Sequence, residues 1–110
     1  MDYHKIDKRI EDYVTGLFDQ MYSPKLTYHK LDHTKAVVKH TQEIAGHYNL
    51  SEGEMLILFA SAWFHDTGYL FTEPEKHEEM SDEVMKKFMK DIVEDQDIID
   101  QISGCILATK

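Results

Sequence analysis

Histidine and aspartate residues lie at two places in the chain where they could bind a metal ion. The stretch "YHKLDHTKAVV" holds His29 and His33 four residues apart, and "FHDTGY" holds the adjacent pair His65 and Asp66. Neutral imidazoles together with a carboxylate are a typical ligand set for divalent transition metals. A metal site requires a fold that brings these two distant segments together.

The hydrophobic pattern predicts an all-α domain of about five helices. Apolar residues recur at intervals of three and four, which is the period of one face of a helix. The first three expected helices cover roughly residues 2–22, 33–48 and 51–66; a fourth follows "LFTEPEKHEEM", and a fifth begins near Asp95. The segment "SPKLTYHKL" is expected to be a loop, because it opens with Ser-Pro.

Helix boundaries are predicted from capping signals. Asp32 is expected to cap the second helix, and Gly68 is expected to end the third in the left-handed conformation. Ser51 with Glu54 and Thr72 with Glu75 have the capping-box spacing at the starts of the third and fourth helices.

The second and third helices should bring His33 beside His65 and Asp66. Their connection is short, which predicts an antiparallel pair, and each is ~22 Å long at ~1.5 Å per residue. The start of one helix is then level with the end of the other, across ~8–10 Å between axes. One metal ion can bridge that gap, and it would compensate a carboxylate at the negative end of the third helix.

Spacing alone leaves other interpretations open. His65 could be a core histidine bonded to a carbonyl, with Asp66 a solvated helix end. His29 shares a face with His33 if the helix begins early; otherwise it lies on a loop over the same pocket or is simply exposed. His77 is expected on the inward face of the fourth helix, where a partly buried histidine without a ligand role fits equally well.

Three further histidines are expected to be structural or solvated: His4, His40 and His47. His40 lies ~10.5 Å along the helix axis from His33, which is too far for a shared coordination sphere.

Composition limits the class of protein. A chain of 110 residues with 42% hydrophobic content fits one domain over residues 1–110. A net charge of -9 argues against a nucleic-acid surface. The single Cys105 favours a reducing cytoplasm. The longest apolar run, residues 55–64, is too short to span a bilayer, so no membrane partner is expected.

Four separated motifs resemble, in order, the HD superfamily of metal-dependent phosphohydrolases: "YHKLDHTKAVV", "FASAWFHDTGY", "HEEMS" and "ISGCILATK". The resemblance covers roughly residues 27–110 and implies an all-α domain whose metal site is built from His, then His-Asp, then a later Asp. It implies His33, His65 and Asp66 as metal ligands. His77 matches, more loosely, a histidine used for a second metal or the substrate phosphate.

The "YH" element is similar to that of cyclic-nucleotide phosphodiesterases, in which this histidine protonates the leaving oxygen. The resemblance therefore implies that His29 is a general acid and that Asp66 orients the attacking water. It implies hydrolysis of a phosphomonoester or phosphodiester, a nucleotide-type small molecule, with a divalent ion (Mn, Mg, Fe, Zn, Ni or Co) as cofactor. Positive charge near the site is expected from three lysines: Lys30, Lys35 and Lys76.

The family's closing Asp lies after the "ATK" segment, and the sequence ends at Lys110. No aspartate near the end of the chain occupies that position: Asp91, Asp95, Asp97 and Asp100 all precede it. The sequence therefore predicts an HD domain incomplete at its C-terminal end, with three ligands of the usual four. Two alternatives follow: a non-catalytic HD-type module that binds a nucleotide or a partner, and a di-iron HD-type oxygenase, which would need more ligands.

The fifth helix carries an apolar stripe that continues almost to the last residue: Ile98, Ile99, Ile102, Ile106 and Leu107. Later helices would cover this stripe in a complete HD domain, so it is expected to be partly exposed here. Exposed apolar stripes usually find a partner. We therefore expect a homo-oligomer, or a dimer that exchanges helices through the fourth and fifth helices.

Overall fold

The computed structural model describes residues 3–20 and 24–108, and for residues 3, 24–30 and 74 it describes the backbone alone. This part of the chain forms helices and no strand, which confirms the all-α class. The elements are α1 (Tyr3–Gln20), α2 (Pro24–Ala45), α3 (Glu52–Phe64), η1 (Thr67–Leu70), η2 (Pro74–Lys76), α4 (His77–Met89) and α5 (Gln96–Leu107). None of the described helices is long and apolar enough to cross a membrane.

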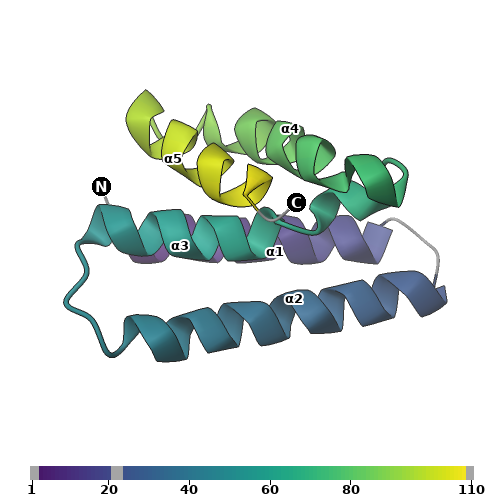
Figure 1. Ribbon diagram of the computed structural model, residues 1–110, viewed down its shortest axis with the longest axis horizontal. Coiled ribbons are helices and arrows are strands. Elements are labelled where there is room, and N and C mark those ends of the chain that lie inside the picture. Colours follow the sequence, from purple (N-terminus) through teal and green to yellow (C-terminus); the bar gives the residue numbers. More distant parts are fainter. Residues whose placement is uncertain (1–2, 21–23, 109–110) are drawn as a thin grey trace.

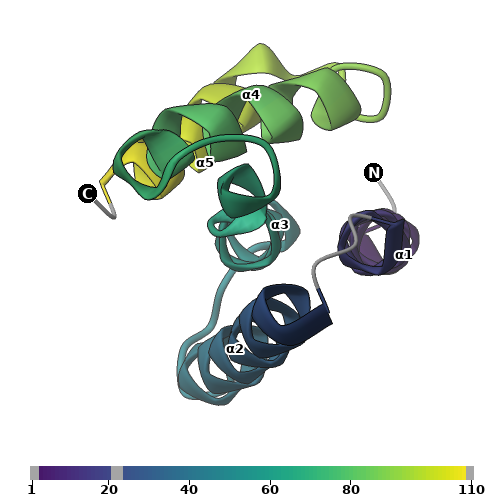
Figure 2. The ribbon, with the colours of Figure 1, turned by 90° about the vertical axis from the view of Figure 1, so that its right-hand side faces the viewer.

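Helix α3 lies at the centre of the bundle. It packs against α1, α2, α4 and α5, and the end-on view shows these helices arranged around it (Figures 1 and 2). A helix that contacts neighbours on several sides must be apolar around much of its circumference. The sequence "EGEMLILFASAWF" meets this requirement. Its buried residues are Leu56, Phe59, Ala60, Ala62, Trp63 and Phe64.

The end of α3 is fixed by aromatic packing. The Tyr13 ring of α1 stacks on the Phe88 ring of α4, with centroids 4.3 Å apart. Phe64, the last residue of α3, contacts both rings at centroid distances of 6.3 and 5.9 Å. Aromatic pairs at these distances add to the stabilisation from burial alone. Three helices are therefore joined just before the His65–Asp66 pair.

Of the two predicted capping boxes, one is confirmed and the other is wrong. The Glu54 N–H donates to Ser51 Oγ at 3.1 Å, and the Ser51 N–H donates to Glu54 Oε1 at 3.0 Å, which completes a capping box. Asp95 caps α5 by accepting the Asp97 N–H at 3.0 Å. The Thr72 and Glu75 pair does not cap α4, because η2 intervenes and α4 begins after Lys76.

Helix α2 begins earlier than predicted. The expected loop "SPKLTYHKL" is helical from Pro24, and Asp32 lies exposed inside the helix instead of capping it. Proline suits the first helical position, because the N–H that it lacks has no partner there. The pairing prediction survives this error: the 13 residues from His33 to Ala45 match the 13 residues of α3.

The apolar stripe of α5 is more buried than predicted, and within it Ile98 and Leu107 are half-buried. Ile99, Ile102 and Ile106 are at most 3% exposed, and Ile98 packs partly buried against the same core. The α5 helix packs against α3 and α4, which close the core over the stripe. Self-association through α4 and α5 stays a prediction, but it would now require α5 to leave this core and exchange with a second copy.

Gly68 lies in η1 and does not form the predicted left-handed helix stop, since no described residue has a positive φ. It is required for a different reason. A Cβ at this position would overlap the His77 carbonyl oxygen and lie 2.8 Å from both the His77 carbonyl carbon and the Ser81 nitrogen. The missing side chain therefore lets η1 pack directly against the start of α4.

Candidate metal centre

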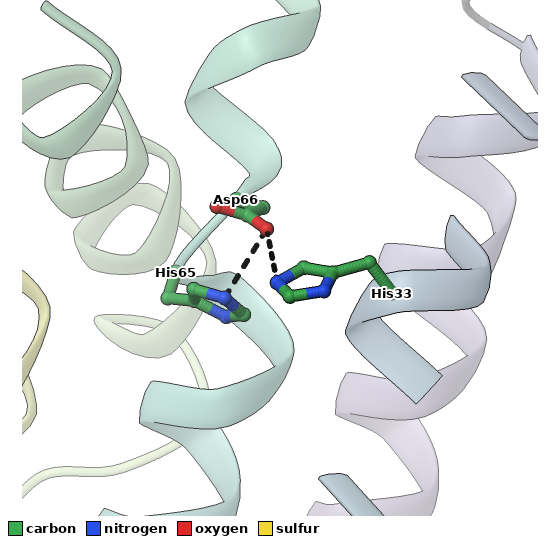
Figure 3. Close-up of side chains that lie close together, drawn as sticks. All are labelled: His33, His65 and Asp66. Carbon is green, nitrogen blue, oxygen red and sulfur yellow. Dashed lines mark ion pairs between the residues drawn. The ribbon is translucent and has the colours of Figure 1, made fainter. Parts of the chain in front are cut away.

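Three side chains from two separate segments converge at the end of α3. His33 Nε2 lies 3.4 Å from Asp66 Oδ2, and His65 Nε2 lies 3.2 Å from the same oxygen (Figure 3). Potential ligand atoms of all three residues lie within 4.8 Å of one another. The convergence expected from the helix pairing is thus observed. Their role as metal ligands remains a prediction.

Asp66 lies at the junction between α3 and η1. It follows α3 and precedes η1, with φ -109° and ψ 3°, and its side chain makes no cap hydrogen bond to the η1 backbone. The side chain is 8% exposed. A buried carboxylate at the negative end of a helix needs nearby positive charge or hydrogen-bond donors. A cation bound between Asp66 and the converging imidazoles would supply the positive charge.

His65 is oriented by its own helix. Its Nδ1 lies 2.6 Å from the Ala62 carbonyl oxygen, which can only accept a hydrogen bond. The proton therefore sits on Nδ1, and the Nε2 lone pair is directed toward Asp66 and His33. Metal-binding histidines are commonly held by such a bond through the second nitrogen. The bond fits a metal ligand and a core histidine alike.

Two of the three distances between these donors match those around a bound transition metal. With ligand bonds of about 2.0–2.1 Å in a tetrahedral site, neighbouring ligand atoms lie about 3.3–3.4 Å apart. The two histidine-to-carboxylate distances are 3.4 and 3.2 Å. His33 is 56% exposed and His65 15%, so the centre has one face toward solvent. Two imidazoles and a carboxylate leave a position there for a further ligand.

His77 stands beside this group without belonging to it. Its Nε2 lies 3.8 Å from Asp66 Oδ1, the oxygen that faces away from the other histidines, and its Nδ1 lies 3.4 Å from Glu78 Oε2. The Tyr69 ring stacks on the His77 imidazole, with centroids 4.0 Å apart and an interplanar angle of 15°. Burial, together with the charges of Asp66 and Glu78, raises the Tyr69 pKa, so the phenol keeps its proton at neutral pH.

A serine of α4 holds the segment that carries Asp66. The Gly68 N–H donates to Ser81 Oγ at 2.8 Å, and the Ser81 hydroxyl donates to the His65 carbonyl oxygen at 2.9 Å. Ser81 is fully buried. Sequence reasoning did not identify it as part of the site. The available signal was a small polar residue four positions after His77, on the inward face of an amphipathic helix.

The other predicted site residues are distributed as follows. His29 lies one helical turn before His33 in α2, and its side chain falls outside the described part of the structure, as does that of Lys30. Lys76 is exposed. Lys35 lines a groove between α1 and α2 instead of the metal centre.

The remaining histidines and aspartates lie outside the described donor group. His40 is exposed beside Glu43, and His47 is exposed after the end of α2. The C-terminal aspartates are all exposed: Asp91, Asp95, Asp97 and Asp100. Among the described residues, the donor group therefore has three members.

Comparison with known proteins gives one match. The family model of the HD domain matches residues 31–105, a segment that runs from α2 into α5 and includes all three converging residues. Neither the curated proteins nor the solved structures yield a match. His29 precedes the matched segment, so the family match does not bear on it. The chain belongs to the HD domain family.

Proposed function

We propose that this protein is a metal-dependent phosphohydrolase that acts on a phosphomonoester or phosphodiester, a nucleotide-type small molecule. The observation that carries the proposal is the convergence of His33 and His65 on one oxygen of Asp66. His33, His65 and Asp66 would hold the ion. A divalent cation here supplies a Lewis acid that polarises a phosphoryl oxygen and acidifies water.

The chain's own residues then have separate tasks. Asp66 offers two oxygens with different neighbours: Oδ2 faces His33 and His65, and Oδ1 faces His77. Asp66 would also orient a water molecule at the edge of the site. His77 is held by Tyr69 and Glu78 and is positioned to donate to a phosphoryl oxygen. His29 would donate a proton to the leaving oxygen.

An anionic substrate requires positive charge at the site. The protein carries a net charge of -9, so an anionic ester needs local compensation to approach the site. A divalent ion, His77 and exposed Lys76, which directly precedes α4, would provide it. Cys105 is exposed and unpaired, which supports the further proposal of a reducing, cytoplasmic location.

One observation favours a second candidate, a non-catalytic HD-type module that binds a nucleotide or a partner. Among the described residues the donor group has three members, and the closing carboxylate of the family's usual set is not one of them. Such a centre could bind its ligand without turnover. A di-iron oxygenase would need still more protein ligands, and no observation among the described residues favours it.

The proposal is tested with purified protein that has been stripped by a chelator and reloaded with one metal at a time. Hydrolysis of nucleoside monophosphates and cyclic nucleotides is followed by phosphate release or chromatography. We expect turnover that depends on the added metal and falls at least 100-fold in Asp66→Asn, with His47→Ala as the matched control, because His47 is exposed and outside the donor group.

The outcomes separate the candidates. Metal-dependent turnover supports the hydrolase. Saturable nucleotide binding without turnover supports the module, and oxygen consumption that requires iron supports the oxygenase. If the wild-type protein binds no metal and Asp66→Asn has no effect on any of these properties, the proposed centre is wrong.

A further inference from the structure

A groove of about 490 Å³ lies between α1 and α2, and none of its lining residues belongs to the candidate metal centre. Its walls are the two helices, which both pack against α3. The α3 residue Trp63 completes the lining. Clefts of roughly 300–1,000 Å³ are typical of small-molecule sites. The size of the groove therefore suits a small ligand.

Trp63 lines the groove from α3. The residue is 96% buried, since its exposed fraction is 4%, and its indole nitrogen lies below the accessible surface, without an acceptor among the described residues. A ligand in the groove would therefore contact other atoms of Trp63.

The two walls of the groove carry opposite charges, with lysines on α2 and carboxylates on α1. On α2, Lys35 and Lys39 are exposed one turn apart, and neither forms an ion pair with a described residue. On α1, Asp19 is likewise exposed and unpaired among the described residues, whereas Asp12 shares Lys8 with a neighbouring glutamate. One wall can thus receive an anionic group and the other a cationic group.

Gly16 keeps the α1 wall open. It lines the groove, and a Cβ built at this position meets no heavy atom within 4 Å. A glycine inside a helix costs stability relative to alanine, yet no neighbour here requires its small size. A larger side chain at residue 16 would project into free space and fill the groove without disturbing the core.

We propose that this groove is a second binding site, distinct from the metal centre, for a small zwitterion. The ligand's carboxylate would lie at Lys35 and Lys39, its ammonium group at Asp19, and the chain between them beside Trp63. Opposite walls of opposite charge select a molecule that carries both charges over one that carries either alone.

The single tryptophan makes the test direct, because fluorescence excited selectively from Trp63 reports on the groove without a label. The metal-stripped protein is titrated with ω-amino carboxylates of increasing length: glycine, γ-aminobutyrate and ε-aminocaproate. Caproate and hexylamine, each with one charge, are the matched controls. We expect a saturable change in emission for at least one zwitterion, and at least about fivefold weaker binding of both single-charge controls.

Variants locate the binding. The double substitution Lys35→Gln with Lys39→Gln, and separately Asp19→Asn, should each weaken binding about fivefold. Gly16→Leu should abolish it. Gly104→Leu, at an exposed glycine of α5 that also has nothing within 4 Å, should bind like the wild type. His33→Ala should also bind normally, because the groove does not include the metal centre.

Several results would overturn the proposal. These are the absence of any saturable response, equal affinity for caproate or hexylamine, unchanged binding in Gly16→Leu, and loss of binding in His33→Ala. Loss of binding in His33→Ala would show that the ligand binds at the metal centre. All the substituted positions are exposed or meet open space. Because Gly16 is itself half-buried within α1, the folding of Gly16→Leu is checked by circular dichroism before the titration.

Discussion

The Nε2 atom of His33 lies 3.4 Å from Oδ2 of Asp66, although the two residues belong to different helical segments of the chain. This contact joins α2 to the end of α3. A bound cation would strengthen that link, because both side chains would then coordinate the same ion. The first two predictions follow from this contact.

His33→Ala should release the metal. Removal of one of three donors should lower metal affinity by at least about 100-fold, since even loss of an outer-sphere partner costs about 10–100-fold. Metal content after gel filtration is measured by plasma mass spectrometry. His47→Ala, at an exposed histidine outside the donor group, should retain the wild-type metal content. Equal metal content in both variants would rule out His33 as a ligand.

Metal binding should stabilise the fold. A ligand that binds only the folded state at 100 times its Kd adds about 2.7 kcal/mol, which corresponds to a rise in Tm of roughly 10 °C for a domain of this size. Differential scanning fluorimetry with and without chelator measures the shift. The shift should disappear in His33→Ala. A metal that raises the Tm of this variant as much as that of the wild type must bind elsewhere.

Gly68→Ala should destabilise the protein by about 1–3 kcal/mol, the usual range for overpacking, because the added methyl group overlaps the backbone at the start of α4. Urea unfolding gives the free energy. Gly104→Ala is the matched control, and it should be stabilising by up to about 1 kcal/mol, because its Cβ meets open space in a helix. Similar stabilities for the two variants would show that η1 can shift away from α4 at little cost.

Asp7→Asn should stabilise the protein at neutral pH. Burial, and secondarily the charge of Glu11, raises the Asp7 pKa, and one of its oxygens is buried without a hydrogen bond. The folded state therefore disfavours the ionised form, a cost that is fully present above the raised pKa and absent below the unfolded value of about 3.9. Because Asp7 is only half-buried, the gain should be on the order of 0.5 kcal/mol.

Thermal unfolding of Asp7→Asn as a function of pH tests the sign. The advantage over wild type should shrink as the pH falls toward about 3.9. Asp91→Asn, at an exposed carboxylate, should change the stability little at any pH. An advantage for Asp7→Asn that grows on acidification would contradict the assigned cause.

The sequence predicted the helices that have strong periodicity and clear caps. The Ser51 capping box was identified correctly, because that interaction depends on residues only three positions apart. The start of α2 was missed, because Pro24 reads as a loop signal although it also suits a helical first turn. Local signals of this kind compete, and tertiary packing decides between them.

The convergence of His33 with His65 and Asp66 was predictable, because it depends only on helix lengths and one short connection. The support around the centre was not. Ser81 and Gly68 act through contacts between η1 and α4, and Gly68 is defined by how closely another backbone approaches it. The burial of the α5 stripe was also missed, because one-dimensional periodicity does not show which neighbours will cover a helix.

Helix α2 lies on the opposite side of α3 from α4 and α5, so it forms an outer layer of the bundle (Figure 2). An outer helix can separate transiently while the remaining helices stay together, and its amides then exchange with solvent faster than those of α3. The metal centre spans this boundary, since it takes one donor from α2 and two from the end of α3. Deuterium uptake by α2 would therefore record the occupancy of the centre, even in a protein that has no turnover.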